Sequence, residues 1–406
     1  MKIFKNIIEN FLYLGIGQGV SGLLYFLATV YLARKLGAEK FGIFSFAESV
    51  FLFFSLLVIF GSDVVGAREI AQADYKDRSD IVSTLIGMRI ISSIVSFLIL
   101  IIFIIAIRNP LETKLFLFIC GLGLFSFIFL LDWFYWGLEK FNIYATYMII
   151  RDLVFLLGVL ISVNFKNNIL LVGVIFLFSK FLYSLLLFIS STKLNLIFKP
   201  RLGLLECKKM IFSCNAIFWA TFIGWIVHYF DIILIAMLYE KKVVGYYSAA
   251  YKPIFYIFMI VVVYLKAIFP VLSKVDKYNP HYFKKILGLT LLSIILVFLP
   301  LGLLFNLFSR DIIIFMYGKN YLPCIDSFKV LAFALLVMSI NTTYSQGIIA
   351  TSREQQNLKI NLFIGTSNIF LNILLIPFCG IVGAAWSKLC AQIFGFLYYR
   401  KELILS

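Results

Sequence analysis

Apolar runs of about twenty residues recur along the whole chain, and they limit its fold more than any other feature. Each run is long enough to cross ~30 Å of hydrocarbon as an α-helix. The 406 residues are 62% hydrophobic and only 14% charged, so they offer too few polar side chains to cover a soluble protein of this size. In lipid, only helices and closed barrels satisfy their backbone groups, and the alternating pattern of barrel strands does not occur. The sequence therefore predicts an all-α membrane protein.

The apolar runs predict twelve transmembrane helices. The predicted spans are residues 7–33, 41–61, 81–106, 114–138, 142–164, 168–190, 210–238, 243–268, 284–306, 325–350, 357–377 and 380–400. The first run follows directly on "MKIFKN" and shows no small-residue cleavage site. We therefore interpret it as a retained helix rather than a signal peptide.

Lys and Arg in the loops predict the orientation of these helices. With the N-terminus in the cytoplasm, nineteen Lys and Arg lie on that side, eleven lie on the opposite side and six lie inside the spans. Because such residues are enriched in cytoplasmic loops, we expect a multi-pass protein of the bacterial inner (cytoplasmic) membrane with both termini in the cytoplasm. The bias accounts for much of the net charge of +16. Its scatter over many short loops favours no nucleic-acid partner.

An internal repeat predicts how the helices are organised. The segment "GIFSFA" at Gly42–Ala47 returns as "GYYSAA" at Gly245–Ala250, a shift of 203 residues. This shift equals six spans, so both copies have the same orientation in the membrane. We expect two six-helix lobes related by a pseudo-twofold axis along the membrane normal, as in transporters with parallel repeats. The lobes are predicted at residues 1–190 and 210–406, with a cytoplasmic linker at 191–209.

Four segments together resemble a known family. They are "YLARKLGAEKFGIFSFA" (Tyr31–Ala47), "FGSDVVGAREIA" (Phe60–Ala71), "VGYYSAAYK" (Val244–Lys252) and "IFPVLSK" (Ile268–Lys274). They are similar to the polysaccharide flippases, which translocate lipid-linked O-antigen and capsule repeat units within the multidrug/oligosaccharidyl-lipid/polysaccharide exporter superfamily. The resemblance covers essentially the whole chain. It implies a V-shaped pair of six-helix lobes, alternating access, and an undecaprenyl-pyrophosphate-linked oligosaccharide as cargo. Membrane lipids and a polysaccharide polymerase are the further partners that we expect.

Ionisable residues inside the predicted spans indicate a polar interior. Such a side chain at the bilayer centre costs about 2.5–3.5 kcal/mol on insertion scales, so it faces a bundle interior or a watery cavity. Six bases outnumber four acids in the spans, which favours an anionic cargo. The bases are Arg89, Arg151, Lys180, Lys252, Lys266 and Lys388, and the acids are Glu48, Asp132, Asp152 and Asp231.

Polar side chains also follow helical spacing. In the eleventh span Asn361, Gly365, Asn368 and Asn372 form one stripe, and amide and aromatic stripes suit the hydroxyls and C–H faces of sugars. The same residue types also hold helices together in lipid, so both interpretations stay open. The substrate-binding candidates are Arg89, Arg151, Lys180, Lys252, Lys388, Asn361, Asn368, Asn372, Tyr147 and Trp225. The candidates for coupling to H⁺ or Na⁺ are Glu48, Asp132, Asp231 and His228.

Two pairs of these ionisable residues need a separate interpretation. His228 with Asp231 is expected more often as a pair that joins helices than as a proton relay. Arg151 and Asp152 are adjacent and about 100° apart on a helix, so they cannot both face one lumen. We predict that Arg151 faces the cavity while Asp152 bonds a neighbouring helix.

Rival functions are disfavoured by what the sequence lacks. A membrane polysaccharide polymerase or glycosyltransferase usually carries one long outer loop, and no predicted outer loop exceeds about 20 residues. No H-E-x-x-H, G-x-S-x-G or phosphate-cradling Gly-rich loop occurs, which indicates that the protein is not an enzyme. Two histidines and six cysteines without C-x-x-C spacing favour neither a metal site nor a cofactor. A cation-coupled drug or metabolite antiporter of the same superfamily is the main alternative, and it should show a net acidic interior.

Overall fold

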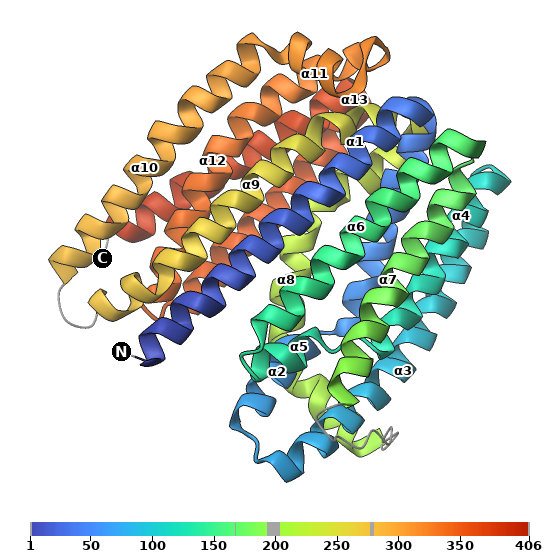
Figure 1. The fold of residues 1–406 in the computed structure, drawn as a ribbon. Helices are drawn as coiled ribbons and strands as arrows, with labels where there is room; N and C mark the ends of the chain where they lie inside the picture. The colour runs from blue at the N-terminus through green and yellow to red at the C-terminus, as the bar shows by residue number, and fades with distance from the viewer. Residues whose placement is uncertain (1, 167, 193–203, 277–279, 405–406) are drawn as a thin grey trace. The chain divides into compact units, whose positions relative to one another are not determined.

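The computed structural model describes residues 2–166, 168–192, 204–276 and 280–404. Within these ranges every regular element is a helix (Figure 1), which confirms the all-α prediction. The first elements are α1 (Lys2–Ile59), α2 (Ser62–Gln72), α3 (Tyr75–Ala106), α4 (Leu111–Leu122), the 3₁₀ helix η1 (Gly123–Ile128), α5 (Asp132–Gly137), α6 (Phe141–Lys166) and α7 (Ile169–Thr192). They are followed by α8 (Leu204–Leu238), α9 (Lys241–Asp276), α10 (Pro280–Leu307), α11 (Ser309–Tyr317), the 3₁₀ helix η2 (Lys319–Cys324), α12 (Ile325–Ala350) and α13 (Glu354–Ile404).

The twelve predicted spans are all found as helical segments. In the described part of the chain, ten helices are long and apolar enough to cross a membrane. Two of them contain two spans each, because α1 breaks at Gly37 with φ 79° and α13 breaks at Gly380 with φ 56°. Both glycines adopt a left-handed conformation that a side chain would disfavour. One predicted span ends and the next begins close to each of these two glycines. The spans could be located from their apolar length, because a helix in lipid satisfies its own backbone groups.

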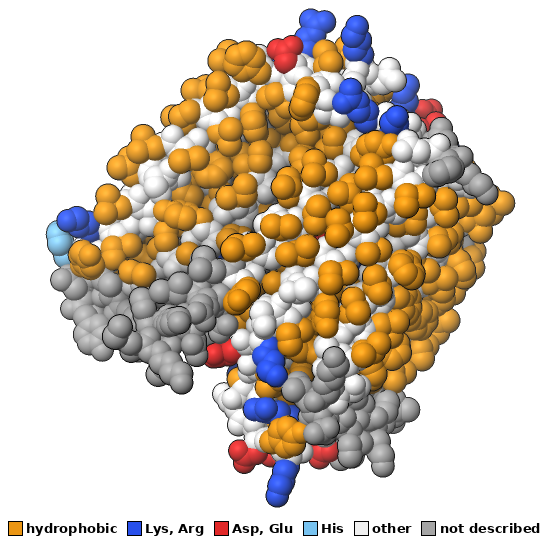
Figure 2. Space-filling model, viewed as in Figure 1, with side chains coloured by type: hydrophobic (Ala, Val, Ile, Leu, Met, Phe, Trp, Pro, Cys, Tyr) orange, Lys and Arg blue, Asp and Glu red, His pale blue; other side chains and the backbone are white. Residues whose placement is uncertain are grey.

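Exposed apolar side chains cover the flanks of the helices. On α3, Ile94, Leu98, Ile102 and Ile105 lie on one face and are between 46% and 71% exposed. Figure 2 shows hydrophobic side chains along the helices, with Lys, Arg, Asp and Glu at their ends. A surface of this kind is stable in hydrocarbon and not in water.

The chain divides into two compact units. Unit 1 comprises residues 1–36 and 46–222, and unit 2 comprises residues 37–45 and 223–406. A core cluster of unit 1 surrounds Trp133, Phe134 and Tyr135 of α5, and one of unit 2 joins α8, α12 and α13. These units differ from the predicted lobes at two places. Residues 37–45 belong to unit 2, and the boundary falls inside α8 rather than in the predicted linker, of which residues 193–203 lie outside the described residues.

The predicted span 114–138 is not one continuous α-helix. It runs through α4, η1 and α5, and the 3₁₀ segment interrupts the i to i−4 bonding in its middle. Backbone carbonyls released in this way need another donor inside a membrane. The guanidinium of Arg89 on α3 donates to the carbonyl oxygens of Phe127 and Leu130. The interrupted span is therefore bonded to α3 at the point where its own helix is broken.

The two glycines that open the repeated segments form a close helix contact within unit 2. A Cβ on Gly42 would lie 1.7 Å from the carbonyl oxygen of Lys241, and one on Gly245 would lie 1.9 Å from that of Ala38. No atom can occupy these positions. The start of α9 and the residue 37–45 segment of α1 thus pack backbone to backbone, as small residues allow in membrane helices.

We expect Gly42→Ala and Gly245→Ala each to lower the free energy of unfolding by about 1–3 kcal/mol, since a methyl group is forced into a filled contact. Gly288→Ala is the matched control, because it lies in α10 of the same unit and has no atom within 4 Å of its Cβ position. It should be neutral or stabilise by up to about 1 kcal/mol through helix propensity. Thermal unfolding of the purified proteins in detergent measures the difference. Equal melting of all three variants would contradict the contact.

Candidate functional site

Arg151 and Asp152 form an ion pair on α6 inside unit 1. Arg151 Nε lies 2.8 Å from Asp152 Oδ1, and Arg151 Nη2 lies 2.7 Å from Asp152 Oδ2. The Ser21 hydroxyl of α1 donates to Asp152, so the prediction that this carboxylate bonds a neighbouring helix is confirmed. The expectation that the two charges point to separate places is wrong. The long Arg151 side chain turns back over its neighbour and also stacks at 5.0 Å from the Tyr183 ring centroid.

The exposures of this pair differ. The Asp152 side chain is 2% exposed and the Arg151 side chain is 20% exposed. Asp152 is therefore the buried anchor, while the Arg151 side chain stays partly accessible. A bidentate arrangement of this kind holds an arginine in one orientation.

Lys180 of α7 has a different environment. Its ammonium lies 5.1 Å from the ring centroid of Phe176 and 6.0 Å from that of Phe51. Among the residues that the structure describes, no carboxylate and no carbonyl group is bonded to this ammonium. Aromatic faces attract a cation but do not neutralise it. The described part of the chain therefore holds Lys180 within a membrane span without a bonded counter-charge.

Glu48 and Asp132 are the acids of unit 1 that the sequence assigned to ion coupling. The Tyr25 hydroxyl donates to Glu48, and the Tyr25 ring stacks on Phe155 at 5.0 Å between centroids. Asp132 begins α5 and accepts the backbone N–H of Trp133 at 2.9 Å. The two acids lie in separate surroundings.

Arg89 is bonded through both terminal nitrogens within unit 1, while its Nε has no hydrogen-bond partner among the described residues. It is 1% exposed, and besides the two carbonyl bonds it forms an ion pair with Asp63 of α2. Asp63 lies outside the predicted spans and was not counted among their acids. The predicted excess of six bases over four acids therefore overstated the positive charge of the interior. Asp63 could have been identified from its position. It follows a predicted span by two residues and is close enough to fold back onto that span.

Unit 2 holds a buried charged network of α8, α9 and α13. Lys388 Nζ lies 2.7 Å from Asp231 Oδ2, and both side chains are at most 1% exposed. The Tyr247 hydroxyl donates to the same carboxylate. The Lys388 ammonium also lies 3.8 Å from the Tyr251 ring centroid. Lys388 and Asp231 therefore compensate each other's charge in a place that solvent does not reach.

His228 is satisfied separately from Asp231. Its Nδ1 lies 2.9 Å from the Tyr251 hydroxyl, and its carbonyl oxygen is 3.4 Å from Lys388 Nζ. His228 and Asp231 thus bond to different partners, and each of them joins α8 to another helix. Tyr247 and Tyr251 were missed, and their spacing of four residues on one helix face was the available signal.

The asparagine stripe of α13 faces the inside of unit 2. Asn361 accepts the Tyr399 hydroxyl at 3.3 Å, and Asn372 Nδ2 donates to Asn368 Oδ1 at 3.0 Å. Asn368 and Asn372 are completely buried. The helix-joining interpretation therefore describes Asn361 well. The buried Asn368 Nδ2 and Asn372 Oδ1 atoms have no hydrogen-bond partner in the described part of the chain.

The remaining substrate candidates contact aromatic groups. Lys252 of α9 is 7% exposed, and its ammonium lies 5.5 Å from the Phe44 ring centroid. Trp225 stacks on Tyr229 at 5.3 Å. Tyr147 packs half-buried on the α5 cluster. Aromatic rings can stack on sugars, and cations beside rings can bind anions.

Apolar helices that enclose compensated charges and an aromatic-lined cation define a multi-pass α-helical membrane protein with a polar interior. The chain belongs to the family described as "Polysaccharide biosynthesis protein", which matches residues 7–276. The family resemblance found in the sequence is thereby confirmed. The coarse localisation, a multi-pass protein of the inner membrane, follows from the same family and the apolar helices.

Known proteins agree with this class. A protein of Escherichia coli (strain K12) described as "Putative O-antigen transporter" is 37% identical over 95 residues, which are 23% of this chain and 22% of that relative. The chain thus matches about a fifth of the length of this curated relative. "Lipid II flippase MurJ, inward closed conformation" superposes with a TM-score of 0.77 at 21% identity, covering 96% of this chain and 86% of that one.

Multidrug transporters share the fold as well. An inward-facing MATE family transporter of the MOP superfamily has a TM-score of 0.74 at 13% identity and covers 95% of both chains. The MATE multidrug transporter DinF-BH has a TM-score of 0.72 at 14% identity, covering 99% of this chain and 95% of that one. The fold is therefore the two-lobed, twelve-helix fold of this superfamily. These relatives are transporters and flippases, in agreement with the prediction that the protein is not an enzyme.

Proposed function

We propose that the protein is a flippase that moves undecaprenyl-pyrophosphate-linked oligosaccharide repeat units from the cytoplasmic to the outer leaflet by alternating access. Membership of a polysaccharide biosynthesis family and a fold similar to a lipid II flippase support this cargo class. In the proposed topology both termini are cytoplasmic, as the distribution of Lys and Arg favours. A polysaccharide polymerase that consumes the exported units is the proposed partner.

The observation that carries the proposal is the environment of Lys180. A cation in a membrane span is costly unless a negative group compensates it. The described residues hold Lys180 with rings and supply no bonded carboxylate. A pyrophosphate that arrives beside it would complete the charge pair in a medium of low dielectric, where such bonds are strong.

The balance of the other charges favours an anion over a cation as cargo. Asp63, Asp152 and Asp231 each have a basic partner within their own unit. A cation antiporter needs acids that are available to its substrate, and these three aspartates already have a basic partner. The further cargo contacts that we propose are Lys252, Tyr147, Trp225 and the partly accessible Arg151. Arg89, Lys388 and Asn361 are left out, since their side chains already bond within their units.

The driving force is proposed to include the membrane potential. Moving negative charge outward from an inside-negative cell releases about 2.3 kcal/mol per charge per 100 mV. A counter-ion, H⁺ or Na⁺, would add to this force. Glu48 is the acid that we propose for it, because Asp231 is already paired with Lys388. Export measured with and without each ion gradient tests the coupling.

Lys180→Gln is expected to reduce export of the lipid-linked glycan at least about tenfold at equal protein abundance, because a charge-assisted hydrogen bond of about 1.5–3 kcal/mol is lost. Lys180→Arg should retain part of the activity, since its charge remains. The matched control is Lys266→Gln, which removes an exposed cation from another span and should export normally.

Export is measured in cells that lack their own flippase, with protein abundance in the membrane determined in parallel. Normal export by Lys180→Gln would overturn the proposed role of this lysine. Export of cationic drugs by the wild-type protein, without any effect on the glycan, would instead favour the antiporter.

A further inference from the structure

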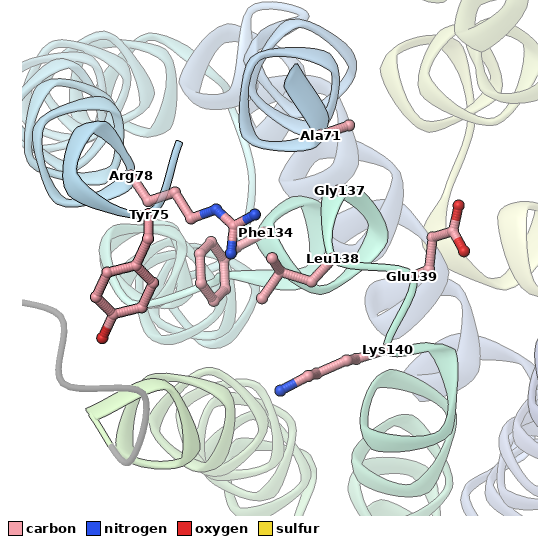
Figure 3. Close-up of a pocket in the computed structure, with 8 residues that line it drawn as sticks. All are labelled: Ala71, Tyr75, Arg78, Phe134, Gly137, Leu138, Glu139 and Lys140. Carbon is pink, nitrogen blue, oxygen red and sulfur yellow. The ribbon is translucent and has the colours of Figure 1, made fainter. Parts of the chain in front are cut away.

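A cavity of about 420 Å³ lies at one end of unit 1 (Figure 3). Its walls come from the beginning of α3, from α5 and from the turn that leads to α6. Three apolar helical segments begin or end there, since Tyr75–Ala106 starts, Leu111–Gly137 ends and Phe141–Asn164 starts. The cavity is therefore at the level where a membrane span meets the headgroups. In the proposed topology this end is cytoplasmic.

The turn between α5 and α6 is a built structure. The backbone N–H of Lys140 donates to the carbonyl oxygen of Tyr135 at 2.9 Å, and that of Glu139 donates to Trp136 at 3.0 Å. Glu139 takes a φ of 56°, which is uncommon for a residue with a side chain. A Cβ on Gly137 would lie 2.6 Å from the carbonyl oxygen of Ala67, so α2 and α5 are in close contact. These contacts hold the side chains of the turn in defined directions.

Two cationic side chains line the cavity. Figure 3 shows Arg78 and Lys140 reaching into this region from separate elements, α3 and the turn, while the Glu139 carboxylate is directed away from the Lys140 ammonium. Neither cationic side chain has a hydrogen bond or ion pair with any residue that the structure describes, and Arg78 Nε is buried without a partner. Buried donors are normally satisfied. The cavity therefore presents donors and positive charge that no residue described by the structure satisfies.

The rest of the lining is apolar and aromatic. Phe134 and Leu138 supply apolar wall, and Tyr75 supplies a ring at the opening. Arg presents a planar fork that matches phosphate oxygens, and Lys adds a point charge. A ligand with a phosphate group next to an apolar part fits both halves of this lining.

We propose that this cavity binds the phosphate of an anionic membrane lipid, with the apolar wall against the first carbons of the lipid. The site is separate from Lys180 and the charged networks described above, and lipid binding requires no transport. Free phosphate shares the headgroup chemistry but lacks the apolar part, so it should bind much more weakly.

Tryptophan quenching in the full-length protein tests this site. Trp133 and Trp136 lie in α5 beside the lining residues. In detergent micelles, phosphatidylglycerol with brominated acyl chains should quench tryptophan fluorescence at concentrations about tenfold lower than brominated phosphatidylcholine does, as expected for one charge-assisted contact. Inorganic phosphate added in excess should leave most of the quenching in place. Reversal of the quenching by inorganic phosphate would overturn the lipid as the ligand and leave a phosphate site.

Variants locate the effect. Arg78→Gln with Lys140→Gln should remove the preference for phosphatidylglycerol, and Arg78→Lys should keep part of it. Lys76→Gln is the matched control, because Lys76 is an exposed cation on the same turn of α3 that does not line the cavity. It should behave as the wild type. Size-exclusion profiles confirm that each variant is folded.

Two results would overturn the proposal. One is equal quenching by both lipids in the wild type, and the other is an unchanged preference in the folded Arg78→Gln, Lys140→Gln variant. A failure of the lipid-binding proposal can be distinguished from a failure of the flippase proposal. Lys180→Gln should lose export while its lipid preference is unchanged, and the cavity variants are judged by binding alone.

Discussion

Lys388→Met is expected to lower the free energy of unfolding by about 3–5 kcal/mol, the usual cost of leaving one member of a buried ion pair without its partner. Asp231 is completely buried, and its carboxylate is held by Lys388 and the Tyr247 hydroxyl. Without the lysine, only neutral donors, the Tyr247 hydroxyl and the backbone N–H of Ile232, are bonded to a full negative charge among the described residues of unit 2. Thermal unfolding in detergent, together with the amount of protein in the membrane, measures the loss.

The double variant separates a structural pair from an ion-coupling site. Lys388→Met with Asp231→Asn removes both charges, and it should recover most of the stability because replacing a buried pair with neutral groups is often harmless. Lys388→Met, Asp231→Asn protein that is stable and still exports glycan would show that the pair only joins helices. If the double variant is stable but no longer responds to an ion gradient, Asp231 belongs to the coupling mechanism and the assignment of Glu48 is wrong.

Arg89→Met is expected to destabilise unit 1 by a comparable amount, about 3–5 kcal/mol. The substitution leaves Asp63 without its ion pair and also removes the donor of the Phe127 and Leu130 carbonyl oxygens at the interrupted span. Lys76→Met is the control on the same helix, where the side chain is exposed. It should change the unfolding temperature little.

The rescue pattern of Arg89 should differ from that of Lys388. Adding Asp63→Asn to Arg89→Met removes the unpaired charge but not the loss of the two bonds from Arg89 to the Phe127 and Leu130 carbonyl oxygens, so recovery should be partial. Full recovery in thermal unfolding would show that the carbonyl bonds contribute nothing. Arg89→Met protein as stable as the wild type would contradict the whole network.

The number and placement of the spans could be predicted because each depends on local sequence. A run such as residues 81–106 satisfies its backbone groups by itself, and its length is set by the bilayer. The break in α1 falls between two predicted spans at Gly37, and the break in α13 falls at Gly380, the first residue of the last predicted span. The 3₁₀ interruption of residues 114–138 was not predicted, since nothing in an apolar run distinguishes a strained turn from a regular one.

The sequence indicated which ionisable residues belong to the candidate site, but not which residues they pair with. Arg151, Lys180 and Lys388 could be singled out because any ionisable residue in an apolar run requires an explanation. The partners of Arg89 and Lys388 could not, since Asp63 and Asp231 lie on other helices. Pairing across helices depends on how each helix is rotated and on its depth in the membrane, which local sequence does not specify.

By itself, the sequence determined that this chain is an all-α membrane protein with twelve spans, and its motifs indicated the family. Both conclusions rest on hydrophobicity and short-range pattern, which act within one helix at a time. Only the tertiary structure decided which charges are compensated. It pairs Arg151 with its own neighbour and Lys388 with Asp231, and it holds Lys180 between aromatic rings. The reason is physical, since a charge in a low-dielectric interior is governed by the atoms within a few ångströms of it, and for Lys388 those atoms come from a helix far away in the chain.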